Sequence, residues 1–231
     1  MSRRAAPSPA STGIIAVGNL KGGVGKSTLA VNLACWFATH PTAPPRKVPV
    51  ALVDADAQGT ALEWADEGHL PVDLIEAPLD ERTDPAAWHQ LISQVRQRSG
   101  LVVIDLPPHW GPALTLALAI ADLLIIPVTP SGADLRATQQ ALERLRTCRR
   151  DRDGAPFAML IPSKVDRRTG AGREIADVLI DLGEPVGPTI AQRSAHVDAF
   201  TTGRWIGDWA PRSAAAREIT ALGDRVREAL I

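Results

Sequence analysis

The stretch that decides the fold runs from Gly13 to Thr28 and reads GIIAVGNLKGGVGKST. It opens on an apolar, β-branched run over residues 13–17, which is typical of a strand buried on both faces of a parallel sheet. A glycine-rich loop follows at once. After the loop, apolar residues recur at helical spacing, so we expect a helix over residues 27–39, which the prolines that follow would end.

The loop between this strand and this helix carries residues that suit a phosphate-binding site. Glycines at 22, 23 and 25 let the backbone curl so that its N–H groups point inward at phosphate oxygens. Lys26 would neutralise the β- and γ-phosphates of a nucleotide, and the Ser27 hydroxyl would bind Mg²⁺. The alternative is a plain glycine-rich turn, but Gly25-Lys26-Ser27 between a strand and a helix favours the phosphate site. We therefore expect Mg·ATP to bind the loop formed by Lys21, Gly22, Gly23, Val24, Gly25, Lys26, Ser27 and Thr28.

Strands and helices are predicted to alternate along the rest of the chain. From apolar runs, helical spacing and capping signals we expect strands over residues 48–53, 72–75, 101–104, 123–128 and 157–161, and helices over 60–66, 85–98, 113–121, 135–149, 173–182, 194–202 and 214–230. This alternation predicts an α/β protein of the P-loop NTPase type, with a mostly parallel twisted sheet and helices on both faces. We expect a single domain over residues 13–231, preceded by a flexible N-terminal tail over residues 1–12.

Three aspartates follow predicted strands, at the sheet edge where folds of this kind bind ligands. Asp54 and Asp56 leave one strand two residues apart, and Asp105 ends another. The first two could hold a water in line with a γ-phosphate, and the third could hold Mg²⁺ directly or through water. Each could instead cap a turn or a helix. The neighbouring phosphate loop favours the metal role for Asp105.

Composition excludes several classes of protein. The chain has 231 residues, 45% of them hydrophobic, and a net charge of −1, so a core is available and any DNA binding must come from a local patch. Cys35 and Cys148 form neither a metal-type pair nor a disulfide framework, which argues against an iron–sulfur carrier. We expect no membrane span and no signal peptide. We interpret the six tryptophans as packing residues.

Residues 19–28 resemble the deviant Walker A loop of the ParA/MinD ATPases. The similarity extends over nearly the whole chain and is strongest to the short ParA-type (ParF-like) partition ATPases that lack an N-terminal helix-turn-helix domain. It implies that Lys21 is the signature lysine, which reaches across an ATP-sandwiched homodimer to the partner's phosphates. Lys21, Lys26 and Asp56 would then be the catalytic residues. The chain departs from the family at Ala57, where proline is usual.

The same resemblance implies roles for further residues. Asp56 would orient the attacking water, and Asp54 would support the Mg²⁺ shell beside the metal ligands Ser27 and Asp105. The pair Ser163-Lys164 stands where related ATPases contact the adenine base.

A basic stretch of the sequence could bind DNA. Residues 144–173 contain nine basic side chains against three acidic ones. Such a stretch could grip phosphate backbones without reading sequence, or it could be the solvated face of an arginine-rich protein. The resemblance favours the first reading, because it implies that Arg193 and Arg217 help the ATP-bound dimer to hold non-specific DNA. It also implies a separate centromere-binding partner of the ParB type and a cytoplasmic, nucleoid-associated protein.

Three functions stay open. The leading hypothesis is a DNA-segregation ATPase for plasmid or chromosome, with a weak intrinsic rate of ATP hydrolysis that its partner stimulates, and with an ATP form that is a dimer or a polymer. The second is a MinD-like or other cargo-positioning ATPase. A membrane-bound version would need a terminal amphipathic helix, and residues 224–231 are too short and too mixed in charge for one. The third is a metabolic enzyme of the dethiobiotin synthetase or amidoligase type, in which a trans-acting Lys21 is rare.

Overall fold

A parallel sheet of six strands forms the centre of the molecule. The computed structural model describes residues 13–41, 49–108 and 112–230, so the tail expected over residues 1–12 lies outside the described residues. The strands stand in the order β3-β2-β4-β1-β5-β6, and every neighbouring pair is parallel. Their bounds are β1 Gly13–Val17, β2 Val50–Asp54, β3 Asp73–Glu76, β4 Leu101–Asp105, β5 Leu123–Val128 and β6 Phe157–Pro162.

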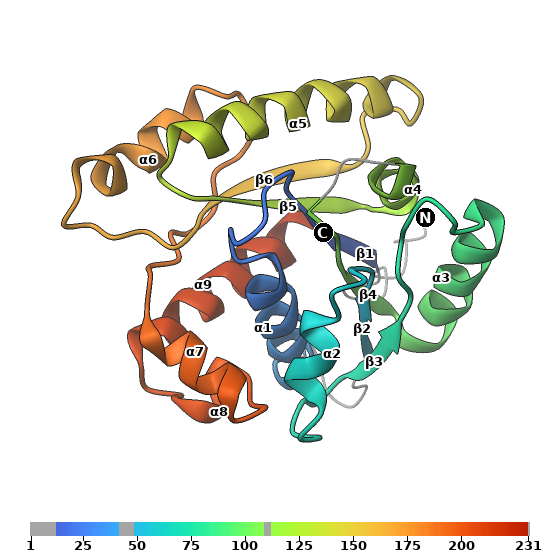
Figure 1. The fold of residues 1–231 in the computed structure, drawn as a ribbon, viewed down its shortest axis with the longest axis horizontal. Helices are drawn as coiled ribbons and strands as arrows, with labels where there is room; N and C mark the ends of the chain where they lie inside the picture. Colours follow the sequence, from blue (N-terminus) through green and yellow to red (C-terminus); the bar gives the residue numbers. More distant parts are fainter. Residues whose placement is uncertain (1–12, 42–48, 109–111, 231) are drawn as a thin grey trace, which may run out of the picture.

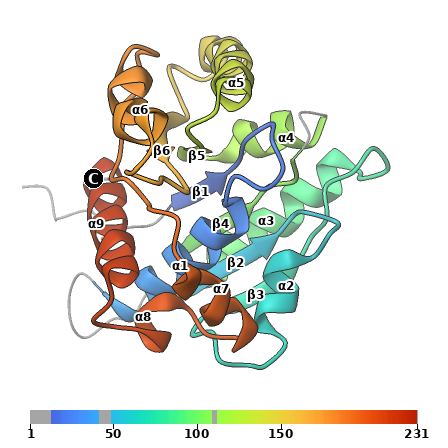
Figure 2. The same cartoon turned by 60° about the vertical axis from the view of Figure 1, so that its left-hand side comes forward.

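The two faces of the sheet are covered by different helices (Figures 1 and 2). One face packs against α1 Lys26–Thr39, α2 Thr60–Ala65, α7 Ser194–Thr201, α8 Ile206–Trp209 and α9 Ala214–Ala229. The other packs against α3 Pro85–Ser99, α4 Pro112–Ile120, α5 Gly132–Arg150 and α6 Gly170–Ile180. This is the α/β architecture with helices on both faces that the alternating sequence predicts.

Side-chain alternation along the strands builds a separate core on each side of the sheet. In β1, Ile15 and Val17 face the α1 side while Ile14 and Ala16 face the α3 side, and all four are almost completely buried. A strand buried on both faces needs apolar residues at every position, which explains why these segments read as continuous apolar runs instead of alternating ones.

Two helices begin earlier than the sequence indicates. The Thr169 side chain accepts a hydrogen bond from the Gly172 N–H, so α6 begins three residues earlier than its apolar spacing indicates. α5 begins at Gly132 instead of residue 135, and no side chain caps its N-terminus. The short helix α8 was not predicted, because four residues are too few to show a helical period.

The segment after α6 returns along the outer edge of β6 and brings residues 190–193 toward the start of α1. Val165 N–H donates to the Ile190 carbonyl, and Gln192 N–H donates to the Val165 carbonyl. This edge segment matters for function, because it places a C-terminal stretch beside the glycine-rich loop.

Helices α1 and α9 pack against each other through Trp36 and Gly223. Trp36 is 1% exposed, and a Cβ placed on Gly223 would lie 2.2 Å from the indole ring. The Arg227 guanidinium also packs on this indole, with its Cζ 4.4 Å from the Trp36 ring centroid. Glycine is therefore required at position 223 by close approach of the two helices.

We predict that Gly223→Ala lowers the free energy of unfolding by about 1–3 kcal/mol, because overpacking against the indole outweighs the better helix propensity of alanine. Chemical denaturation would measure the change. Gly132→Ala is the matched control: its nearest neighbour is the mobile end of Arg136, 3.7 Å away, and the expected change is within about 0.5 kcal/mol. Equal stabilities for the two variants would contradict the close packing of α1 and α9.

Candidate nucleotide site

The glycine-rich loop joins β1 to α1 at the carboxyl edge of the sheet. Gly23 and Gly25 have φ angles of 77° and 96°, a backbone conformation that side chains with a Cβ rarely adopt. Gly25 is also the N-cap of α1, and no side chain caps that end of the helix. The first N–H groups of α1 are therefore available to an anion, with the positive end of the helix dipole behind them.

Lys26 is held in this loop with little access to water. Its side chain is 6% exposed, and its Nζ donates a hydrogen bond of 3.0 Å to the Lys21 carbonyl. Burial lowers the pKa of Lys26, while the nearby carboxylates of Asp105 and Asp56 oppose that shift. A buried ammonium group needs negative charge close to it, and a polyphosphate at the helix start would supply it.

Asp105 stands at the end of β4 as a buried carboxyl group without a partner. It is 0% exposed, and neither oxygen has a hydrogen-bond partner among the described residues. Burial raises the pKa of Asp105 to about 7, although the nearby Ser27 hydroxyl and the Lys26 charge lower it. A buried, unsatisfied carboxylate next to a serine hydroxyl is the oxygen donor set that suits Mg²⁺. The residues present therefore fit the metal that the sequence predicts.

Asp54 is fully buried as well, but the backbone satisfies it. Its Oδ2 accepts the N–H groups of Ala61 and Leu62 at 2.9 and 3.1 Å, and its Oδ1 accepts the Asp56 N–H at 3.1 Å. Burial raises the pKa of Asp54, and these three donors oppose the shift. The structure thus gives Asp54 the capping role that the sequence left open, while its part in a Mg²⁺ shell stays a prediction.

Asp56 lies close to this group on the loop between β2 and α2. Its side chain is half-buried, and one oxygen accepts the Gln58 N–H at 3.0 Å. The second oxygen accepts no hydrogen bond from the described residues, and its predicted role in orienting water stays a prediction.

Ser163 and Lys164 lie against the loop, and their contact with the adenine base stays a prediction. The Ser163 hydroxyl donates to the Val24 carbonyl at 2.7 Å, and a Cβ on Gly25 would meet this hydroxyl at 3.0 Å. Ser163 therefore fixes the loop from the β6 side. Lys164 is exposed and has a positive φ of 52°.

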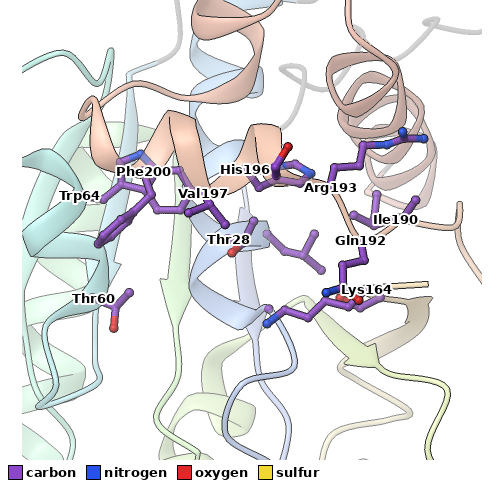
Figure 3. A pocket seen from close by; sticks show the side chains of 15 residues that line it. Thr28, Thr60, Trp64, Lys164, Ile190, Gln192, Arg193, His196, Val197 and Phe200 are labelled. Atoms are coloured by element: carbon purple, nitrogen blue, oxygen red, sulfur yellow. The ribbon is translucent and has the colours of Figure 1, made fainter. Parts of the chain in front are cut away.

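A cavity of about 550 Å³ opens beside the loop (Figure 3). Gly25, Thr28 and Leu29 form its floor, and Ser163 and Lys164 border it. Its remaining walls come from segments that the sequence did not connect with the site, and they include Thr60, Trp64, Ile190, Gln192, Val197 and Phe200. A mostly apolar cavity beside a phosphate loop suits the base and sugar of a nucleotide. No local motif marks these wall residues, because only tertiary packing brings α2 and α7 together.

Lys21 and the two predicted DNA-contacting arginines have different surroundings. The Lys21 side chain is exposed, and its predicted role in a second subunit's site stays a prediction. Arg193 forms a two-pronged ion pair with Glu218, whose oxygens lie 2.6 and 3.2 Å from its nitrogens, and this contact raises the pKa of Arg193. Arg217 is exposed and donates to the Arg212 carbonyl. Both arginines lie at the α9 side of the molecule, and their contact with DNA stays a prediction.

No helix among residues 13–41, 49–108 and 112–230 has the length and hydropathy needed to cross a membrane.

The chain resembles characterised proteins over almost its entire length. A protein named Maintenance of carboxysome distribution protein A, from Gloeobacter kilaueensis, is 34% identical over 97% of this chain and 96% of its own. The chromosome-partitioning ATPase Soj of Thermus thermophilus is 28% identical over 92% of this chain and 94% of its own. Among solved structures, the ATP complex of a Cyanothece McdA variant has a TM-score of 0.71 at 16% identity, over 96% of this chain and 97% of that one.

The model of the CobQ/CobB/MinD/ParA nucleotide-binding domain matches residues 15–204. That span contains the loop, all three aspartates and most of the cavity wall. The chain therefore belongs to the ParA/MinD family of P-loop ATPases.

Proposed function

We propose that this protein is a cargo-positioning ATPase, which binds Mg·ATP, forms a homodimer around two nucleotides and hydrolyses ATP slowly to reset the cycle. The observation that carries the proposal is the combination of a buried Lys26, an unsatisfied Asp105 and an exposed Lys21 on one glycine-rich loop. The first two suit binding of a metal nucleotide in the subunit itself. The third is free to serve a second subunit.

The geometry of the site supports the following proposed roles. Lys26 and the N–H groups of the loop hold the phosphates, and Ser27 and Asp105 hold Mg²⁺, which neutralises phosphate charge when bound. Asp56 orients a water molecule toward the γ-phosphate through its uncommitted oxygen. Lys21 lends its ammonium group to the phosphates of the other subunit, so that dimerisation depends on ATP.

The comparisons favour positioning of a cargo over DNA partition in the strict sense. The relative named for carboxysome distribution is more similar to this chain than the chromosome-partitioning relative, at 34% against 28% identity. We therefore propose a large assembled body as the cargo. The alternative cargo is a plasmid or chromosome bound by a ParB-type partner. With either cargo, the ATP-bound dimer binds non-specific DNA of the nucleoid, and this DNA is the surface along which the cargo is positioned.

A membrane is less compatible with the structure as the surface to which the dimer binds. Helix α9 buries Ile219, Leu222 and Val226 against the rest of the molecule. Its apolar face is therefore committed to the core, and a membrane-binding helix needs such a face to be free.

We predict that Lys21→Ala abolishes ATP-dependent dimerisation while ATP binding to the single subunit persists. Loss of one partner from a buried charge pair costs about 2–5 kcal/mol at each site. Light scattering with Mg·ATP, in an Asp56→Ala background that blocks hydrolysis, would measure the dimer. Arg98→Ala, on exposed α3 surface, is the control and should dimerise normally. A Lys21→Ala variant that hydrolyses ATP as a monomer would instead support a metabolic enzyme.

We predict that Arg217→Ala weakens retention of non-specific DNA by the ATP-bound dimer. Each lost phosphate contact should reduce the slope of log affinity against log salt concentration by about 0.9. The measurement is DNA retention at several salt concentrations with ADP and with a non-hydrolysable ATP analogue. Arg98→Ala removes an equal charge on the opposite face of the sheet and should leave the slope unchanged. Identical slopes for the two variants would exclude α9 from the DNA surface.

A further inference from the structure

The loop that carries Asp56 and the helix that follows it are fastened together by one carboxylate. Asp54 accepts the Asp56 N–H with one oxygen and the N–H groups of Ala61 and Leu62 with the other. The Asp56 carbonyl in turn accepts the Gly59 N–H at 2.9 Å. Because a buried acceptor cannot give up these donors without cost, Asp56 and α2 have to move as a unit.

The far end of α2 forms one wall of the cavity through Trp64. This residue is 2% exposed and lies next to Phe200 of α7, with ring centroids 5.2 Å apart and an interplanar angle of 81° (Figure 3). The Trp64 Nε1–H donates a hydrogen bond of 2.9 Å to the Arg204 carbonyl. α2 is thereby attached to the turn that connects α7 with α8.

That turn is itself fixed to the phosphate-binding helix. The Ile206 N–H donates to the Asn32 side chain of α1 at 2.8 Å. At Gly203, which has a φ of 62°, a Cβ would lie 2.5 Å from the Glu67 Cβ, so the turn fits closely against the chain just after α2. The cavity wall, α2 and α1 therefore form a continuous set of contacts.

We propose that Trp64 is a positioning residue that makes the placement of Asp56 depend on the nucleotide base. A base in the cavity would hold the Trp64 and Phe200 rings in place, and α2 would pass this restraint to Asp56 through the Asp54 carboxylate. Inorganic triphosphate would fill only the loop, and the Trp64 and Phe200 rings would have no base to pack against. The inference rests on the proposed function, since it assumes that the cavity takes the base of ATP and that Asp56 acts in hydrolysis.

The test is Trp64→Phe, which leaves a smaller ring in the wall for the base to pack against and removes the Nε1–H bond to the Arg204 carbonyl that holds the ring in place. Trp88→Phe is the matched control: Trp88 is 4% exposed, donates its Nε1–H to the Ala77 carbonyl at 3.1 Å, and lies on the opposite face of the sheet. Two readouts are needed: kcat and KM for ATP, and amide hydrogen exchange of residues 21–28 and 54–60. Exchange would be measured with Mg²⁺ plus either a non-hydrolysable ATP analogue or inorganic triphosphate.

In the wild type we expect the analogue to protect both segments and triphosphate to protect residues 21–28 alone. Trp64→Phe should lose the protection of residues 54–60 and lower kcat about 10- to 100-fold, in the range of a small misplacement of a catalytic group. Its KM and the protection of residues 21–28 should stay near wild type. Trp88→Phe should preserve kcat and both protections.

Wild-type protection of residues 54–60 by triphosphate alone would overturn the inference, and so would a Trp64→Phe variant that behaves like Trp88→Phe. Neither result would touch the proposed function, which fails instead if wild type shows no protection of residues 21–28 by the analogue. Should Trp64→Phe fold poorly, Phe200→Leu removes the ring of α7 that packs against Trp64, and a loss of protection at residues 54–60 is again expected.

Discussion

The structure depends on three ionisable side chains that are almost completely buried at one edge of the sheet. Lys26, Asp54 and Asp105 are at most 6% exposed, and burial of a charge without compensation is costly. Backbone N–H groups satisfy Asp54, and a backbone carbonyl with nearby acids partly satisfies Lys26. Asp105 has no such partner among the described residues. The site is therefore complete only when a cation meets Asp105 and an anion meets Lys26, which is what a metal nucleotide provides.

The fold brings these charged side chains together at the carboxyl edge of the sheet. Parallel strands bring the ends of β1, β2 and β4 to one edge, with Val17 paired to Asp105 and Asp54 paired to the same residue from the other side. The helices on the α1 face then extend the site sideways, because α2, α7 and the edge segment along β6 enclose the cavity. The proposed phosphate and base sites thus occupy neighbouring parts of one surface, joined by α1 and α2.

The sheet and the glycine-rich loop between β1 and α1 could be predicted from the sequence alone, because both leave local patterns. Apolar runs gave the strand β5 at its observed bounds, and Gly25-Lys26-Ser27 located the loop. The cavity could not be predicted in this way, since Trp64 and Phe200 lie far apart in the chain and meet only through packing. For Asp54 the sequence left a capping role open, but it could not name the capping partners, which are seven and eight residues away. The ion pair of Arg193 with Glu218 was missed for the same reason.

A calorimetric titration with a non-hydrolysable ATP analogue, with and without Mg²⁺, tests the central claim most directly. If the unsatisfied Asp105 carboxylate is the metal's place, Mg²⁺ should strengthen binding to the wild type, and Asp105→Asn should lose most of that gain while retaining metal-free binding. An equal gain from Mg²⁺ in the variant, or no binding of the analogue to the wild type, would contradict the account.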